Sequence, residues 1–580
     1  MIIGIFLSLQ TFAQYEEEKV REAERWADSV YQSLSLTERI GQLIFIRANY
    51  SGENYLQEVP DLIKKYNLGG VTFFAGNPLD QVLQTNIYNQ LPRVPLFISI
   101  DAEWGLGMRL SNTVSYPLQM TLGAVRNENL IYEMGRQIAQ QCRRMGIHIN
   151  FAPVVDVNNN PENPVIGMRA FGDMPGDVAR KGALYMKGLQ DGNVLASAKH
   201  FPGHGDTRVD SHKDLPVLKK SKRDLRELEF KPFKYLIDEG VASVMVAHLS
   251  VPSFDRRKYR PASLSENLIG KQLKKRMGFG GLVISDGLDM KGVTKYFRPG
   301  EIALEAFTAG NDILLIPEDI PASVSAIQQA IASGKVEEER LEESCRKILK
   351  YKYLVGAHQR KTIDTAHLPA DLNKRAYFRL REQLFDSAIT LVKNDRNLVP
   401  LSYPDTIKPA LVIIGEENPQ PFAEAFRQFM PVAVHYLRHD ADINARQQLF
   451  SEIEEANMLI VALVNTNISA ARNYGITDGD IQFVEFLARQ KPVILDVFAS
   501  PYVLDFFSDA GIFHAILVSY QDKPGIQRKS AGIILGMDAS SGKLPVSAGG
   551  FTTGTGWSTP KTRLSYAMSN PCSKGWIYLL

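Results

Sequence analysis

Short, continuous apolar runs alternate with longer amphipathic stretches from residue 43 onward. Runs of Val, Ile and Leu without alternation are typical of parallel strands buried on both faces, and the stretches between them have helical periodicity. Eight such units before residue 320 predict a (β/α)8 barrel of the TIM type rather than an open sheet. The eight runs are Leu43–Ile46, Gly70–Phe74, Leu96–Asp101, Phe151–Val157, Val194–His200, Ser243–Leu249, Gly281–Asp286 and Asp312–Ile316. Intervening helices are predicted at Asn127–Met145, Asp177–Leu189, Lys222–Asp238 and Ser265–Met277.

A second, smaller set of apolar runs follows a polar segment at residues 358–375, which we interpret as a linker. These runs predict an open sheet with helices on both faces. They are Leu411–Ile414, Val432–Leu437, Met458–Val464, Val493–Phe498 and Phe513–Tyr520. The expected fold class is therefore α/β, with a barrel domain over 15–357, a smaller α/β sandwich domain over 376–560 and a tail over 561–580.

The first fourteen residues, MIIGIFLSLQTFAQ, resemble the apolar part of a secretory signal, with a small residue before a plausible cleavage point. This predicts export to the periplasm or the cell exterior. The alternative is an N-terminal helical turn buried on the first domain.

Composition narrows the class of protein. The chain has 580 residues, 44% hydrophobic and 22% charged, which is typical of globular proteins and too long for one core. A net charge of +2 favours no nucleic-acid partner, and no apolar run approaches the ~20 residues of a membrane helix. The cysteines Cys142, Cys345 and Cys572 are far apart and form no CxxC pair, so no disulfide framework or zinc motif is indicated, although a single disulfide stays open.

Candidate chemistry follows the strands, because barrel active sites lie at the carboxyl ends of strands. The segment Lys199–His212 (KHFPGHGDTRVDSH) holds several histidines and aspartates, and Gly203 and Gly205 predict a mobile loop. Three interpretations stay open on spacing alone. Several groups could converge on a metal, Asp210 could orient His212 as a proton donor, or the loop could merely satisfy its own polar groups.

A second feature is the apolar run that ends in Asp286. A carboxylate in a barrel mouth can attack an anomeric carbon or hold a cation. The alternative is a helix N-cap after the strand. Asp101 ends the third run in the same way.

These motifs resemble a known family. KHFPGHGDT followed by DSH, with ISDGLDM further along, is similar to glycoside hydrolase family 3 and specifically to its β-N-acetylhexosaminidase branch. FAPVVDV, GMRAFGD and ISIDAEWG match as well, so the resemblance covers roughly residues 35–355 and, more loosely, the second domain. It implies a retaining enzyme that removes terminal β-linked N-acetylglucosamine from cell-wall fragments or chitooligosaccharides through a covalent glycosyl-enzyme.

The resemblance also implies residue roles. Asp286 corresponds to the nucleophile, His212 to the general acid/base and Asp210 to its partner in the dyad. The positions that match sugar-binding residues are Asp101, Arg169, Lys199 and His200. No metal and no cofactor are expected, because Lys199 and His200 then serve sugar hydroxyls. Gly287 departs from the family, where an acidic residue is common.

Two other functions are weighed against this one. A β-glucosidase or β-xylosidase of the same family draws its acid/base glutamate from the second domain and lacks the DSH dyad. A catalytically silent carbohydrate-binding protein would have lost Asp286, Asp210 or His212, and all three are present. The expected partner is a small carbohydrate, with neither nucleic acid nor stable membrane insertion.

Overall fold

The computed structural model describes residues 2–48, 53–211, 213–401, 407–416 and 420–562, and it divides into two compact units. The first comprises Met1–Tyr116, Ile131–Asp156 and Ala179–Phe378. The second comprises Pro117–Leu130, Val157–Val178 and Arg379–Leu580. Two segments that lie between barrel strands in sequence therefore group with the C-terminal part of the chain, which strand periodicity alone does not reveal.

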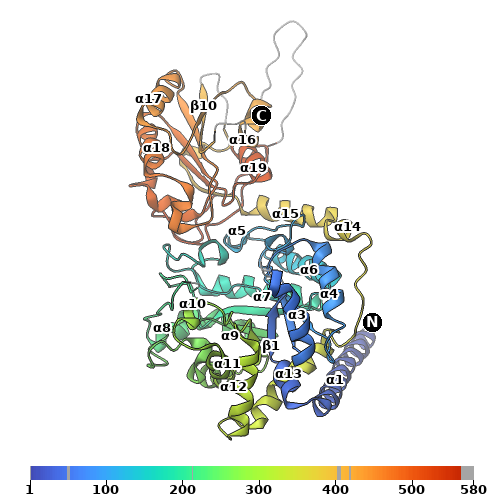
Figure 1. Ribbon diagram of the computed structural model, residues 1–580. Helices are drawn as coiled ribbons and strands as arrows, with labels where there is room; N and C mark the ends of the chain where they lie inside the picture. Colours follow the sequence, from blue (N-terminus) through green and yellow to red (C-terminus); the bar gives the residue numbers. More distant parts are fainter. Residues whose placement is uncertain (1, 49–52, 212, 402–406, 417–419, 563–580) are drawn as a thin grey trace. The chain divides into compact units, whose positions relative to one another are not determined.

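The first unit is the predicted barrel (Figure 1). Eight parallel strands follow the order β7-β6-β5-β4-β3-β2-β1-β8, and a bridge between Ile284 and Ile313 joins the two ends of the sheet. Its strands are β1 Ile44–Arg47, β2 Gly70–Phe73, β3 Phe97–Ile100, β4 Ile149–Asn150, β5 Leu195–Phe201, β6 Ser243–Val246, β7 Leu282–Ser285 and β8 Leu314–Leu315. The (β/α)8 prediction is thus confirmed.

Helices connect these strands, and each of the four predicted helical stretches is helical. The α-helices are α1 Ile2–Ser33, α2 Leu36–Gly41, α3 Glu53–Tyr66, α4 Pro78–Tyr88, α6 Asn129–Arg144, α7 Pro175–Asp191, α8 Lys222–Asp224, α9 Phe230–Asp238, α10 Lys291–Thr294, α11 Pro299–Ala309, α12 Ile320–Ala332, α13 Glu338–Leu354 and α14 Leu368–Leu372. Shorter 3₁₀ or π turns are η1 Leu106–Met108, η3 Leu225–Glu229, η4 Ala262–Leu264 and η5 Asn267–Arg276. Helix α14 lies within the segment predicted as a linker.

The fourth strand is the one barrel strand whose predicted position is wrong. The apolar run Phe151–Val157 predicted it, but the regular strand is Ile149–Asn150. Pro153 interrupts the run, and a proline has no N–H to donate to a neighbouring strand. Pairing resumes only as a bridge between Val154 and Lys199. The run is fully buried, which explains its apolar composition.

Helix α1 contains the segment predicted as a signal peptide and packs against α13. The contact involves the buried side chains of Ala23, Ala27 and Tyr31. Cys142 and Cys345 are buried free thiols, whereas Cys572 lies outside the described residues. Export therefore remains a prediction.

A lysine is buried where α13 passes the start of β1. Lys352 is fully buried, its Nζ donates to Gln42 Oε1 at 2.8 Å, and it lies 5.6 Å from the centre of the Phe97 ring. Burial lowers the pKa of Lys352 to about 7. A lysine in the unfolded chain keeps its proton up to pH ~10.4. Between pH 7 and 10 the unfolded state thus binds more protons, and stability rises with pH.

We therefore expect Lys352→Met to raise the free energy of unfolding by about 1–3 kcal/mol at or below pH 7, because it removes a buried charge. The gain should shrink as the pH rises from 7 toward 10, because folded wild-type Lys352 becomes neutral while the unfolded lysine keeps its proton up to pH ~10.4. Denaturant unfolding of both proteins across this range checks the prediction. A gain that does not depend on pH would contradict it.

The second unit is built on a six-stranded sheet of order β11-β10-β12-β13-β14-β9. All five predicted strands are present in it. Figure 1 shows α17 and α18 on one side of the sheet and α16 and α19 on the other. Its strands are β9 Thr390–Asn394, β10 Pro409–Ile414, β11 Ala433–Leu437, β12 Met458–Leu463, β13 Val493–Val497 and β14 Ala515–Val518. Its helices are α5 Gln119–Gly123, α15 Arg375–Ala388, α16 Pro421–Arg427, α17 Ile443–Glu452, α18 Asp478–Gln490 and α19 Pro524–Ile534, with short turns η2 Gly167–Arg169, η6 Asp395–Asn397, η7 Ala470–Gly475, η8 Pro501–Phe506 and η9 Ala510–Ile512.

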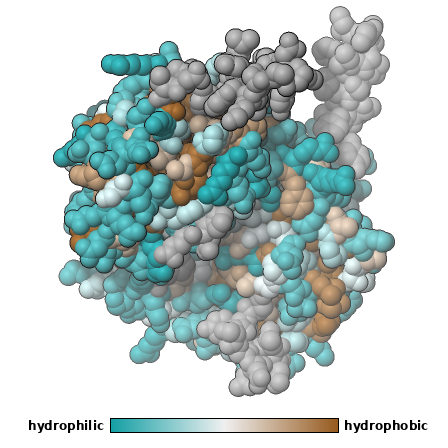
Figure 2. All heavy atoms as spheres, turned by 90° about the horizontal axis from the view of Figure 1, so that it is seen from above, coloured by the Kyte–Doolittle hydropathy of each residue, from teal (hydrophilic) through white to brown (hydrophobic). Residues whose placement is uncertain are grey.

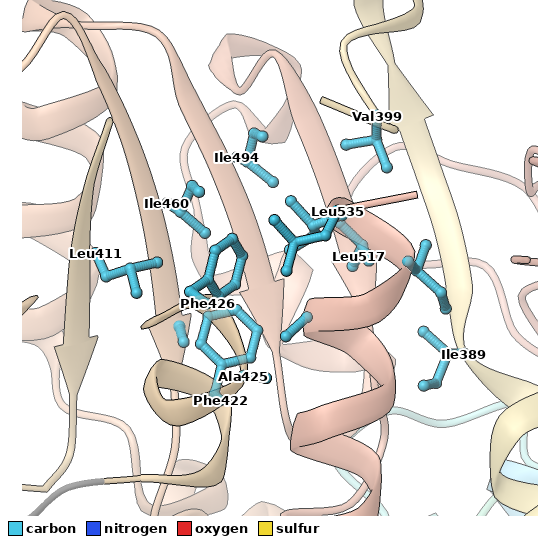
Figure 3. Packing of buried hydrophobic residues seen from close by; sticks show 14 of the residues in the cluster. Ile389, Val399, Leu411, Phe422, Ala425, Phe426, Ile460, Ile494, Leu517 and Leu535 are labelled. Carbon is cyan, nitrogen blue, oxygen red and sulfur yellow. The ribbon is translucent and has the colours of Figure 1, made fainter. Parts of the chain in front are cut away.

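The sequence analysis missed the edge strand β9, which pairs antiparallel with β14. Its apolar residues Leu391 and Val392 are buried and could have indicated it. On one face of the sheet, strand residues such as Ile460 and Ile494 pack near Phe422 and Phe426 of α16 (Figure 3). This buried cluster makes the second unit a folded domain with its own core.

The surface is mainly polar where Figure 2 displays it, with hydrophobic residues in small separate patches. Among the described residues, none of the helices has the length and apolar character required to cross a membrane.

Candidate active site

Side chains that follow β3 and β5 form a cluster of alternating charge at the mouth of the barrel. Lys199 of β5 is 1% exposed, and its Nζ contacts the Asp101 carboxylate and lies 2.7 Å from Glu103 Oε1. Arg109 holds the same aspartate from the other side, with Nη2 2.6 Å from Asp101 Oδ2 and Nε 3.0 Å from its carbonyl oxygen. Two cations thus compensate two carboxylates at a largely buried position.

This arrangement orients Asp101. Its side chain remains 17% exposed, whereas Lys199 and Glu103 are covered. A carboxylate held by two cations keeps a fixed direction and can still accept hydrogen bonds from hydroxyl groups that enter the mouth. Asp101 and Lys199, which were predicted to bind sugar, lie together. Glu103 is a buried partner of Lys199.

The imidazole of His200 is held by a buried aspartate that follows β4. Asp156 Oδ2 lies 2.7 Å from His200 Nδ1, and Asp156 Oδ1 accepts the backbone N–H groups of His200 at 3.1 Å and His204 at 2.7 Å. Burial by itself would raise the pKa of Asp156, but the two histidines hold it below its usual range. An ionised Asp156 favours a proton on His200 Nδ1 and fixes the orientation of the ring.

The loop after β5 begins over a buried carboxyl group. Gly203 has φ +120°, and a Cβ at this position would lie 2.5 Å from Glu229 Oε2, so glycine is required. Burial raises the pKa of Glu229 to about 7, although Lys220 at 2.8 Å opposes the shift. Lys220 Nζ also lies 3.0 Å from Asp206 Oδ2 and so links the loop to Glu229.

Further along, the loop is attached to the segment that follows β7. Gly292 N–H donates to Ser211 O at 3.1 Å. Asp214 accepts from Lys295 Nζ at 2.7 Å and from Tyr296 Oη at 2.6 Å. These contacts lie on either side of position 212 in the sequence. Asp210 directly precedes the first of them and is half-buried, and His212 lies outside the described residues.

Asp286 directly follows β7, at the same end of the barrel. Its N–H donates to Val246 O at 2.9 Å, and its Oδ1 accepts the N–H of Gly287 at 2.9 Å. His248, at the end of β6, supports this turn, with Nε2 2.8 Å from Gly287 O. The half-buried carboxylate of Asp286 therefore stands on a backbone fixed by two neighbouring strands.

Asp289, three residues later, is a different kind of carboxylate. Its Oδ2 is paired with Arg47 Nη2 at 2.9 Å, and the guanidinium of Arg47 lies 4.5 Å from the centre of the Phe74 ring. An aspartate bound to an arginine that stacks on an aromatic ring is a weaker nucleophile, because its charge is compensated. The assignment of Asp286 as the reacting group stays a prediction.

Arg169, the remaining predicted sugar-binding residue, belongs to the second unit. It ends the short turn η2, and its Nη1 donates to Val165 O at 3.4 Å. Among the described side chains, no three His, Cys, Asp or Glu residues gather in a way that could hold a metal ion. His212 is not among them, so the expected metal independence stays a prediction.

Two contributors to the site were given no role from the sequence. Arg109 lies in the stretch DAEWGLGMR that was singled out for Asp101, and its chemistry as a carboxylate partner was the available signal. Asp156 lies at the end of a predicted strand, but nothing in its local sequence indicated that it would hold His200. A contact between two strands decides the role of Asp156, and a turn within the segment after β3 brings Arg109 back to Asp101.

The chain is similar to known glycoside hydrolases in sequence and in structure. A family model described as the N-terminal domain of glycosyl hydrolase family 3 matches residues 35–351. The chain is 29% identical over 561 residues to beta-hexosaminidase A of Pseudoalteromonas piscicida, covering 84% of this chain and 90% of that protein. It is 32% identical over 316 residues to beta-hexosaminidase LpqI of Mycobacterium tuberculosis, covering 52% of this chain and 79% of that protein. A solved structure, a family 3 β-N-acetylglucosaminidase from Paenibacillus sp. str. FPU-7, is similar with a TM-score of 0.72 and 28% identity, covering 89% of this chain and 99% of that one.

Proposed function

This chain belongs to glycoside hydrolase family 3, in its β-hexosaminidase branch, and from that premise we propose that it is a retaining exo-β-N-acetylglucosaminidase. The observation that carries the proposal is the half-buried carboxylate of Asp286 at the end of β7, at the barrel end where Asp101 and Lys199 also lie. A nucleophilic carboxylate beside groups that bind hydroxyls is what glycosyl transfer to an enzyme requires.

In the proposed first step, a carboxylate oxygen of Asp286 attacks the anomeric carbon, and His212 protonates the departing glycosidic oxygen. A covalent glycosyl-enzyme results. In the second step His212 removes a proton from water, whose oxygen displaces Asp286 and restores the original anomeric configuration. Asp210 holds the other ring nitrogen of His212 and favours its protonated form.

The sugar at the non-reducing end would be bound by Asp101, Lys199 and His200. Arg169, which belongs to the second unit, is predicted from the sequence for the same role. Arg109 and Asp156 would not touch the sugar themselves. They are positioning residues, because they hold Asp101 and His200 in place. In this proposal the Arg109–Asp101 and Asp156–His200 pairs fix the orientation of the sugar-binding side chains.

The proposal is tested with paired chromogenic substrates. We expect release of nitrophenol from the β-N-acetylglucosaminide at least ~10-fold faster, in kcat/KM, than from the β-glucoside, and ¹H NMR should show the β-anomer of N-acetylglucosamine as the first product. Preference for the glucoside would favour a β-glucosidase. An α-anomer formed first would contradict a retaining mechanism.

Activity should also survive exhaustive chelation, because the histidine-rich loop is assigned to proton transfer and sugar binding. The measurement is the nitrophenyl assay before and after dialysis against EDTA, with kcat unchanged as the expected result. Activity that is lost with EDTA and restored by zinc or manganese would instead assign the loop to a metal.

We further propose that the protein acts outside the cytoplasm on cell-wall fragments or chitooligosaccharides. The apolar N-terminal segment supports export, and both substrates present terminal N-acetylglucosamine.

A further inference from the structure

A pair of stacked tyrosines at the mouth of the barrel is not used by the proposed reaction. The rings of Tyr259, in the loop after β6, and Tyr296, in the segment after β7, lie 4.4 Å apart with an interplanar angle of 10°. Tyr259 is 55% exposed and has φ +58°, a backbone conformation that is unfavourable for a bulky residue. Neither burial nor backbone preference accounts for a tyrosine there.

The pair is attached to the loop that carries the dyad. Tyr296 Oη donates to Asp214, two positions after His212, and Lys295 donates to the same carboxylate. The group that protonates the glycosidic oxygen faces the leaving group in such a reaction. The tyrosines therefore lie on the leaving-group side of the site rather than beside the terminal sugar.

The surrounding loops carry an excess of positive charge. Between residues 250 and 260 the acid Asp255 is paired with Arg257, and between residues 287 and 298 the acid Asp289 is paired with Arg47. Four cations of these two stretches have no ion pair with any described residue: Arg256, Lys258, Lys291 and Arg298. Arg256 and Lys258 are exposed and lie three residues and one residue before Tyr259 in the sequence.

We propose that Tyr259, supported by Tyr296 and preceded by Arg256 and Lys258, forms a leaving-group subsite that selects a sugar bearing a carboxylate. The proposal rests on the proposed glycosidase function. An aromatic face packs against the C–H face of a sugar ring, and unpaired cations attract a carboxylate and raise the rate of productive encounter. Among the two proposed substrates, the lactyl-substituted amino sugar of muropeptides carries such a group and the chitooligosaccharides do not.

Three substrates distinguish a change in this subsite from a change in the catalytic residues. They are N-acetylglucosaminyl β-fluoride, whose leaving group is a single atom, the neutral disaccharide N,N′-diacetylchitobiose, and the anionic disaccharide N-acetylglucosaminyl-β-1,4-N-acetylmuramic acid. For the wild type we expect a higher kcat/KM on the anionic disaccharide than on the neutral one. The preference should fall as salt rises, because exposed charges are screened.

The double variant Arg256→Gln/Lys258→Gln should lower kcat/KM on the anionic disaccharide about three- to tenfold and leave the fluoride and the neutral disaccharide unchanged. Tyr259→Ala should lower kcat/KM on both disaccharides and leave the fluoride unchanged, whereas Tyr259→Phe, which keeps the ring, should resemble the wild type. A matched charge control is Lys275→Gln/Arg276→Gln, at the exposed end of η5 that leads into β7. A matched aromatic control is Tyr235→Ala, at a 40% exposed position on α9.

The subsite is overturned if the wild type does not prefer the anionic disaccharide, if the double variant keeps the wild-type preference, or if Tyr259→Ala loses activity equally on all three substrates. Failure of the wild type to hydrolyse the fluoride would contradict the proposed function instead. Calorimetric binding of the intact anionic disaccharide to wild type and double variant would then still decide the subsite, which requires weaker binding by the variant.

Discussion

Replacement of Asp286 by alanine is expected to lower kcat on nitrophenyl β-N-acetylglucosaminide by several orders of magnitude while the fold is retained. Without this carboxylate no covalent glycosyl-enzyme can form. Because the Cβ atom and the backbone contacts of Asp286 with Val246 remain, far-UV circular dichroism and the melting temperature should be close to those of the wild type. Azide, a small nucleophile that can occupy the space of the lost carboxylate, should restore turnover and yield the α-glycosyl azide.

The neighbouring aspartate provides the control. Asp289→Asn keeps the shape of the side chain and removes the charge that pairs with Arg47, so we expect at most a ~10-fold loss in kcat/KM. A 2-fluoro or 5-fluoro glycosyl donor that traps the intermediate should label the peptide at Asp286. Label on Asp289, or a larger loss in Asp289→Asn than in Asp286→Ala, would show that the nucleophile is misassigned.

The second large effect concerns the dyad, and it should depend on the leaving group. A dinitrophenolate leaves with little protonation, whereas a sugar alkoxide requires a proton. His212→Ala should therefore reduce kcat/KM on a natural disaccharide ~10²–10⁴-fold more than on the dinitrophenyl glycoside. Asp210→Ala should show the same trend more weakly, because it removes only the partner of the imidazole.

Asp214→Asn is a matched control for the dyad variants, since Asp214 lies on the same loop and binds Lys295 and Tyr296. It should not produce the dependence on leaving group. Kinetics on a series of aryl glycosides of rising phenol pKa gives the slope directly. Equal slopes in wild type and His212→Ala would mean that the acid lies elsewhere, for example on the second unit.

Much of the architecture was predictable because burial on both faces leaves a continuous apolar run in each parallel strand. Seven of the barrel strands were found this way close to their observed positions. The fourth was displaced, because the buried run Phe151–Val157 is apolar for packing reasons while Pro153 prevents regular pairing. The edge strand β9 was missed because it precedes the predicted second set of strands and follows helix α15 without a turn signal.

The sequence alone determined the class of fold and the family resemblance. It also predicted the site residues, because the family motifs fall at predicted strand ends at Asp101, Lys199, His200 and Asp286. Only the tertiary structure decided how they are held. Asp156, after β4, holds His200 of β5, Arg47 of β1 pairs with Asp289 after β7, and Tyr259 meets Tyr296 from a separate loop. Local sequence encodes strand ends and turns, but these pairings depend on how the closed sheet brings distant strand ends to one mouth.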